Sequence, residues 1–218
     1  RDRIAYIFAP TFNPLKLTAT KMNGIQRRID CYLDGQMDFP MSARIGAAQP
    51  VVVPLLAPDP TWYFPTQQST SILLTHLGGG TYSGAITVDC AGFTANDFPV
   101  IRVVGQLDFS ALTTKVSSTT IATISGLPGS NTIASGETWE FDFRPGFRTV
   151  RRTSDNANRL SGIANASIEH FGLVRVLSEK NVRRTTPTAT TMTFNVLGTN
   201  GSGAPQLQVS YYKRYASL

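Results

Sequence analysis

Residues 82–90 read Tyr-Ser-Gly-Ala-Ile-Thr-Val-Asp-Cys, and apolar and polar side chains alternate along this stretch. Successive side chains of a β-strand point to opposite faces, so Ile86, Val88 and Cys90 would share one face. Ser83 and Thr87 would lie on the other. This alternation predicts a strand with one buried face and one polar face.

The same period of two recurs along the chain. Strands are predicted on this basis at residues 101–109, 139–143, 192–196 and 207–211, and with weaker patterns at 28–33, 71–76, 112–124 and 168–177. Alternation, in place of continuous apolar runs, favours antiparallel sheets. The sequence therefore predicts an all-β fold, an antiparallel β-sandwich. One short helix is predicted at residues 154–163, capped by Ser154 or Asp155.

Two segments interrupt the strand pattern. Residues 47–65 contain five prolines, which a central strand does not accommodate, so an extended covering loop or a sheet edge is predicted there. Residues 1–25 combine Pro10 and Pro14 with apolar side chains and predict an extended N-terminal arm, which packs on its own domain or on a neighbouring subunit. The predicted organisation is an arm at 1–25 and a single domain at 26–218.

The net charge of +6 lies entirely in the second half of the chain. Arginines dominate that excess, and Arg binds phosphate through a planar, bidentate group. The residues predicted to bind nucleic acid through its phosphates are Arg144, Arg148, Arg151, Arg152, Arg183 and Arg184. Two alternatives remain open, namely charges that only aid solubility and ion pairs with Glu140, Asp142, Asp155 and Glu179 at subunit interfaces.

Residues for catalysis or metal binding are sparse. The chain has two histidines, His76 and His170, and neither accompanies a nucleophile elbow or a zinc-ligand spacing. We therefore predict no enzyme activity and no catalytic, metal-binding or cofactor-binding residues. One enzymatic alternative, a glycosidase-type site, would use Glu140 or Glu137 with a second carboxylate.

Two cysteines, Cys31 and Cys90, are too few for a disulfide framework. Buried free thiols are favoured, and a bridge between the two remains open. No stretch approaches about 18 consecutive apolar residues, so no membrane span is predicted.

Charged residues make up only 16% of the chain, and Thr and Ser take their place. Such a surface suits coverage by neighbouring molecules, because the cores of protein interfaces are depleted of charge. A homo-oligomer of many copies is therefore expected.

This pattern of alternating strands, an extended arm and Thr/Ser/Pro/Gly-rich connections resembles the jelly-roll coat proteins of small icosahedral viruses. The resemblance implies eight antiparallel strands in two packed sheets. It also implies a capsid subunit that self-assembles around a genome, expected to be RNA, and that resides in the virion. The alternative is a carbohydrate- or receptor-binding β-sandwich, of the lectin or fibre-head type, that exposes Trp62, Tyr63 or Trp139.

Overall fold

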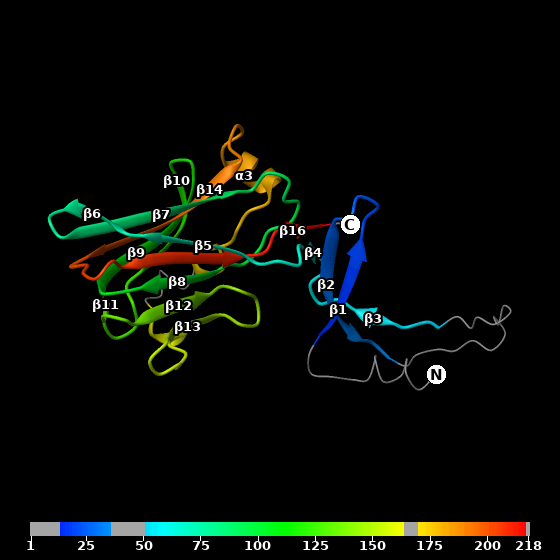
Figure 1. Ribbon diagram of the computed structural model, residues 1–218, viewed down its shortest axis with the longest axis horizontal. Helices are drawn as coiled ribbons and strands as arrows, with labels where there is room; N and C mark the ends of the chain where they lie inside the picture. The colour runs from blue at the N-terminus through cyan, green and yellow to red at the C-terminus, as the bar shows by residue number, and fades with distance from the viewer. Residues whose placement is uncertain (1–13, 36–50, 164–169, 217–218) are drawn as a thin grey trace. The chain divides into compact units, whose positions relative to one another are not determined.

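A computed structural model describes residues 14–35, 51–163 and 170–216 of the chain (Figure 1). Antiparallel β-sheets dominate these residues, which confirms the predicted all-β class. The chain forms two compact units, which are treated separately below. Unit 1 comprises residues 1–65 and 216–218, and unit 2 comprises residues 66–215.

Unit 1 contains a small antiparallel sheet. Its described strands are β1 (Leu15–Thr20), β2 (Gln26–Leu33), β3 (Leu55–Leu56) and β4 (Trp62–Tyr63). β2 pairs with each of the other three. Leu17 lies opposite Ile29, so these side chains share a face with Cys31. Ile29 and Cys31 are buried, whereas Leu17 is 45% exposed.

The predicted segment boundaries differ from those of unit 1. The predicted boundary between arm and domain, at residue 25, falls in the connection between β1 and β2. Residues 15–20 of the predicted arm form strand β1, which pairs with β2. Residues 1–13 of the predicted arm lie outside the described residues. The proline-rich segment from residue 51 onward forms extended chain with the two-residue strands β3 and β4, and residues 47–50 are not described.

Unit 2 holds the remaining elements. They are β5 (Gln68–Leu73), β6 (Thr75–Gly78), β7 (Thr81–Asp89), β8 (Val100–Val104), β9 (Leu107–Val116), β10 (Thr119–Ser125), β11 (Thr132–Ile133), β12 (Thr138–Asp142), β13 (Thr149–Arg152), the 3₁₀ helix η2 (Leu160–Gly162), α3 (Glu179–Thr185), β14 (Thr191–Thr199), β15 (Gln206–Tyr211) and β16 (Arg214–Tyr215).

The long strands of unit 2 form two antiparallel sheets. Sheet I has the strand order β13-β12-β8-β15-β5. Sheet II has the order β10-β9-β14-β7-β6, and β11 pairs with β9. Both sheets are visible in Figure 1. Consecutive strands often change sheet, so residues far apart in the sequence become neighbours.

The two sheets bury their apolar faces against each other. Phe141 of sheet I and Phe109 of sheet II are fully buried, and their ring centroids lie 5.8 Å apart. Phe143 extends this contact to Phe171, with centroids 4.3 Å apart. Aromatic pairs at such distances add stability beyond the area they bury. The core therefore occupies the space between sheets I and II.

The predicted strand at residues 101–109 is wrong in one respect, because it is interrupted around Gly105 and forms two strands, β8 and β9. β8 belongs to sheet I and β9 to sheet II, so the chain turns a corner between them. Alternation continues through the corner, since Val103 and Leu107 are both buried. Residues 71–76 divide in the same way between β5 and β6, and residues 112–124 form a hairpin of β9 and β10.

The helix prediction at residues 154–163 is also wrong. Only the 3₁₀ helix η2 forms there. The Asp155 carboxylate accepts hydrogen bonds from the Ala157 backbone and from Arg152 and Arg159, which stabilises a turn. The predicted strand at 168–177 is wrong for its described part, because residues 170–171 are helical and only Val176 makes an isolated bridge, to Asp97. Helix α3 was not predicted.

The cysteine prediction is confirmed, because Cys31 and Cys90 are both buried free thiols. Burial raises the pKa of the Cys90 thiol to about 12.

Candidate nucleic-acid interface

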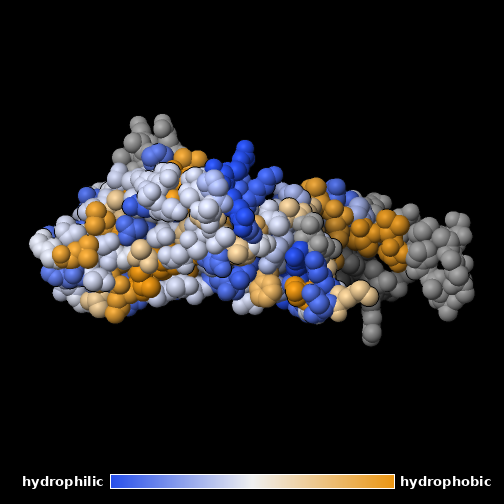
Figure 2. Space-filling model, turned by 90° about the horizontal axis from the view of Figure 1, so that it is seen from above, coloured by the Kyte–Doolittle hydropathy of each residue, from blue (hydrophilic) through white to orange (hydrophobic). Residues whose placement is uncertain are grey.

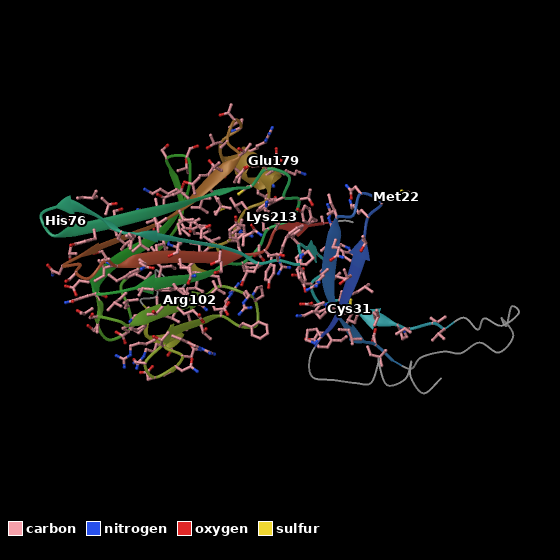
Figure 3. The ribbon with its side chains drawn as sticks, in the orientation of Figure 1. Met22, Cys31, His76, Arg102, Glu179 and Lys213 are labelled. Carbon is pink, nitrogen blue, oxygen red and sulfur yellow. The ribbon has the colours of Figure 1, made fainter. Side chains whose placement is uncertain are left out.

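The predicted arginines lie in two separate places in unit 2. Four of them, Arg144, Arg148, Arg151 and Arg152, lie on β13 or on the loop between β12 and β13. Arg183 and Arg184 lie on α3, which packs against β14 of sheet II. Figure 3 labels Arg102 of sheet I and Glu179 of α3, which lie apart within unit 2. The six residues are thus carried by two different parts of the fold, the β12–β13 hairpin and α3.

Strand register aligns a row of polar side chains across the outer face of sheet I. Glu140 lies opposite Arg151 on one side and Arg102 on the other. Nε and Nη2 of Arg102 each approach Oε2 of Glu140 at 2.7 Å. Gln208 follows in the same row, with its Oε1 3.5 Å from Nη1 of Arg102. Glu140 therefore pairs with Arg102, an arginine outside the predicted set.

The loop between β12 and β13 carries Arg144, Phe147 and Arg148 on its surface. Nε and Nη2 of Arg144 donate to the two oxygens of Asp142, at 2.9 and 2.6 Å. This bidentate pair raises the pKa of the Arg144 guanidinium. The same guanidinium lies 5.5 Å from the centre of the Phe147 ring. Arg148 is exposed and makes no ion pair within the described residues.

A second ionic cluster forms where β13 leaves the sheet. Arg152 contacts Glu137 at 3.2 Å and Asp155 at 2.8 Å. Arg159 also contacts Asp155. The hydrogen bond from Arg152, with the Ala157 backbone and Arg159 adding to it, holds the pKa of Asp155 well below its ordinary value. This cluster stabilises the turn, and its charges largely compensate each other.

Helix α3 supplies the second basic location. Arg183 contacts Glu179 at 2.7 Å, one turn earlier on the helix. The other carboxylate oxygen of Glu179 accepts a hydrogen bond from the Gly92 backbone at 2.8 Å. Lys180 and Arg184 are exposed and make no ion pair within the described residues. The Lys213 ammonium lies 5.7 Å from the centre of the Phe93 ring, and Phe93 accepts a backbone hydrogen bond from Glu179.

Local carboxylates thus compensate much of the predicted positive charge, through ion pairs within the chain itself. Asp142, Asp155 and Glu179 pair with Arg144, Arg152 and Arg183, respectively. The exposed cations left without an ion pair in the described residues include Arg148 near sheet I, and Lys180 and Arg184 on α3. These positions have the charge to contact phosphate groups.

Sequence reasoning missed Arg102 and Lys213 at these surfaces. Arg102 occupies a polar position in its strand, but its pairing with Glu140 depends on the register between β8 and β12. Lys213 lies over the ring of Phe93, and the Phe93 carbonyl accepts the backbone hydrogen bond of Glu179 at the start of α3. No local signal in the sequence specifies either long-range contact.

The residues named for the alternative functions have other environments. Trp139 is only 3% exposed, because it points inward from β12, so its prediction as part of a sugar-binding platform is wrong. Trp62 and Tyr63 are half-buried. Glu137 and Glu140, named for glycosidase chemistry, both pair with arginines.

Other classes of site are not formed by the described residues. Within them, no three His, Cys, Asp or Glu side chains come together as a potential metal site. None of the described helices is long and apolar enough to cross a membrane. Comparisons with family models, with curated proteins and with solved structures found no match to this chain.

Proposed function

We propose that unit 2 is a jelly roll and that this chain is a coat subunit that assembles with copies of itself into an icosahedral shell. The observation that carries the proposal is the pairing of eight long strands. β5 pairs with β15, β7 with β14, β8 with β12, and β9 with β10. This is the pairing of one long hairpin folded over itself, and a jelly roll consists of eight such strands in two sheets.

Two further strand pairings support the same assignment. β14 also pairs with β9, and β15 with β8, which joins the four hairpin pairs into sheets I and II. Edge strands β6 and β13 and the short β11 add to this framework. They are the strands of sheets I and II beyond the eight of the jelly roll.

The outer face of sheet II supports self-association. Ser83 donates to Asn195 at 3.0 Å, and Thr87 and Thr193 contact each other at 3.4 Å across the sheet. Weakly polar residues cover much of unit 2 in Figure 2, with strongly hydrophilic residues confined to patches. Such a face costs little to desolvate, because its hydroxyl and amide groups already bond one another.

Unit 1 provides a second reason to expect partner copies. Its exposed large hydrophobic side chains are Leu17, Met22, Ile25, Tyr32, Val52 and Leu56. Hydrophobic patches on this unit are visible in Figure 2. Small sheets need packing partners for stability, and exposed apolar patches mark interaction sites. In the proposed shell, neighbouring subunits cover these side chains.

The enclosed genome is proposed to be RNA, bound through phosphates at the uncompensated cations. Binding of this kind weakens as salt concentration rises, because counterions compete for the phosphates. Arg148 and Arg184 are the predicted residues best placed for such contacts, since both are exposed and neither makes an ion pair in the described part of the chain. The proposed location of the protein is the virion.

The proposal is tested by the assembly state of the purified chain. We expect sedimentation velocity and negative-stain electron microscopy to show closed particles of uniform size. The variant Leu17→Ser/Leu56→Ser should reduce particle yield, because it removes exposed apolar contacts. The control variant Thr20→Ser changes an exposed position of the same sheet and should assemble normally. A chain that stays monomeric across protein concentration, salt and added RNA would refute the proposed function.

A further inference from the structure

The loop between β12 and β13 presents one aromatic ring to solvent. Phe147 is 66% exposed, although Phe141 and Phe143 nearby are fully buried. The core therefore does not use this ring. Exposed single hydrophobic residues are common, so the significance of Phe147 depends on its surroundings.

Those surroundings hold the ring beside positive charge. The Arg144 guanidinium lies 5.5 Å from the centre of the Phe147 ring. Arg144 is itself fixed by its bidentate pair with Asp142, whose side chain is only 7% exposed. Arg148 follows directly in the sequence and is exposed, and its guanidinium lies beside Gly172. An exposed flat ring beside one guanidinium, with a second exposed arginine next in the sequence, offers a stacking surface for a base and positive charge for its phosphates.

The loop is also anchored at both ends. The Phe147 backbone N–H donates to the Arg144 carbonyl at 3.0 Å, which closes the turn. Gly146 adopts a φ of 79°, a conformation that glycine accepts without strain. Buried Phe143 and Val150 hold the two sides of the loop in the core. Ordering the loop on binding therefore costs little.

We propose that this loop binds single-stranded nucleic acid, with one unpaired base stacked on Phe147 and adjacent phosphates contacting Arg148. The inference rests on the proposed genome-binding function and deepens it. It specifies an unpaired strand at the contact, because bases in a duplex are already stacked on their neighbours. Recognition is tolerant of sequence, since every base offers a π-face.

The test measures binding of the full-length chain to fluorescently labelled oligouridine and oligothymidine, and to a duplex of equal phosphate content. Phe147→Ala should weaken single-strand binding about tenfold and leave duplex binding unchanged. Phe147→Trp should restore binding. Phe147→Leu is the matched control, because it keeps apolar bulk without a flat ring, and it should behave like Phe147→Ala.

The dependence of binding affinity on salt concentration distinguishes the stacking role of Phe147 from the phosphate contact of Arg148. Arg148→Gln should weaken binding to both probes and lower the slope of log affinity against log salt by about 0.7 on single strands. Phe147→Ala should leave that slope unchanged. Equal single-strand affinity of the wild type and Phe147→Ala would overturn the inference, as would wild-type affinity of Phe147→Leu.

Particle formation by the same variants distinguishes this inference from the proposed function. Loss of assembly in Phe147→Ala with unchanged oligonucleotide binding would identify the loop as a contact between subunits and overturn the inference. A wild-type chain that forms no particles, but loses single-strand binding on Phe147→Ala, would support the inference and refute the shell.

Discussion

At the scale of single residues, the acidic side chains of unit 2 have mostly structural roles. Asp97 is 2% exposed and accepts hydrogen bonds from Arg214 and from the Tyr212 backbone. This contact ties the C-terminal segment to the loop before β8. Asp142 fixes Arg144, and Asp155 organises the turn after β13. The carboxylates thus fix loops whose backbones the sheets do not hold.

Asp155 gives these contacts a pH dependence. Its pKa is held below the ordinary value of about 3.9, so its ionised form stabilises the folded state. That contribution is complete above about pH 5 and is lost as pH falls through the unfolded-state pKa toward the lowered folded-state pKa. Asp155→Asn should lower the free energy of unfolding at pH 7, and the difference from wild type should shrink below pH 4.

Urea unfolding at a series of pH values, followed by tryptophan fluorescence, measures this effect. Asp89→Asn is a suitable control, because Asp89 is exposed and makes no ion pair in the described residues. A difference between Asp155→Asn and wild type that stays constant down to pH 2 would contradict the assigned pKa shift.

Cys90 should be chemically inert in the folded chain. Burial, with the neighbouring Asp89 charge, raises its pKa to about 12. At pH 8 almost none of such a thiol is ionised, and the thiolate is the reactive form. In a Cys31→Ser variant, we expect Ellman's reagent to react with Cys90 only after denaturation. Rapid reaction of the native protein would show that Cys90 is accessible and ionised.

At the scale of elements, the corners between the sheets depend on close backbone approach. A Cβ at Gly105 would lie 2.5 Å from Cγ2 of Ile133 and 3.0 Å from its carbonyl oxygen. Ile133 is fully buried and pairs with Leu107. The chain can pass from β8 to β9 at this point because residue 105 has no side chain.

Gly105→Ala should therefore destabilise unit 2 by about 1–3 kcal/mol, the usual cost of overpacking a core. Gly172→Ala is the matched control, since a Cβ there meets only Arg148 side-chain atoms at 3.7 Å or more. Thermal unfolding of both variants measures the difference. Equal melting temperatures would indicate that Ile133 shifts without cost.

At the scale of the whole molecule, the strands of sheets I and II all lie within unit 2. Unit 2 also contains the continuous hydrophobic core. Folding and assembly can therefore be separated experimentally. A fragment of residues 66–218 should unfold cooperatively, because it retains that core, but should not form particles, because it lacks the apolar surface of unit 1.

Circular dichroism melting and sedimentation velocity on this fragment test both expectations. A non-cooperative melt would show that unit 2 needs unit 1 to fold. Normal particle formation by the fragment would show that the exposed side chains of unit 1 are not subunit contacts.

The sequence by itself determined where most of the long strands of unit 2 lie and which of their faces are buried. Ile86 and Val88, for example, are buried as their alternation predicted. That pattern is local, because the period of two follows from the extended backbone alone. It also placed Arg144, Arg148, Arg151 and Arg152 near one another, since they are close along the chain.

Only the tertiary structure decided where strands end at corners and which carboxylate pairs with which arginine. Arg102 meets Glu140 through the register of two strands from distant parts of the chain. Gly105 ends a strand because Ile133, 28 residues later, packs against it. Such contacts depend on how all the strands pack together, and no window of neighbouring residues contains that information.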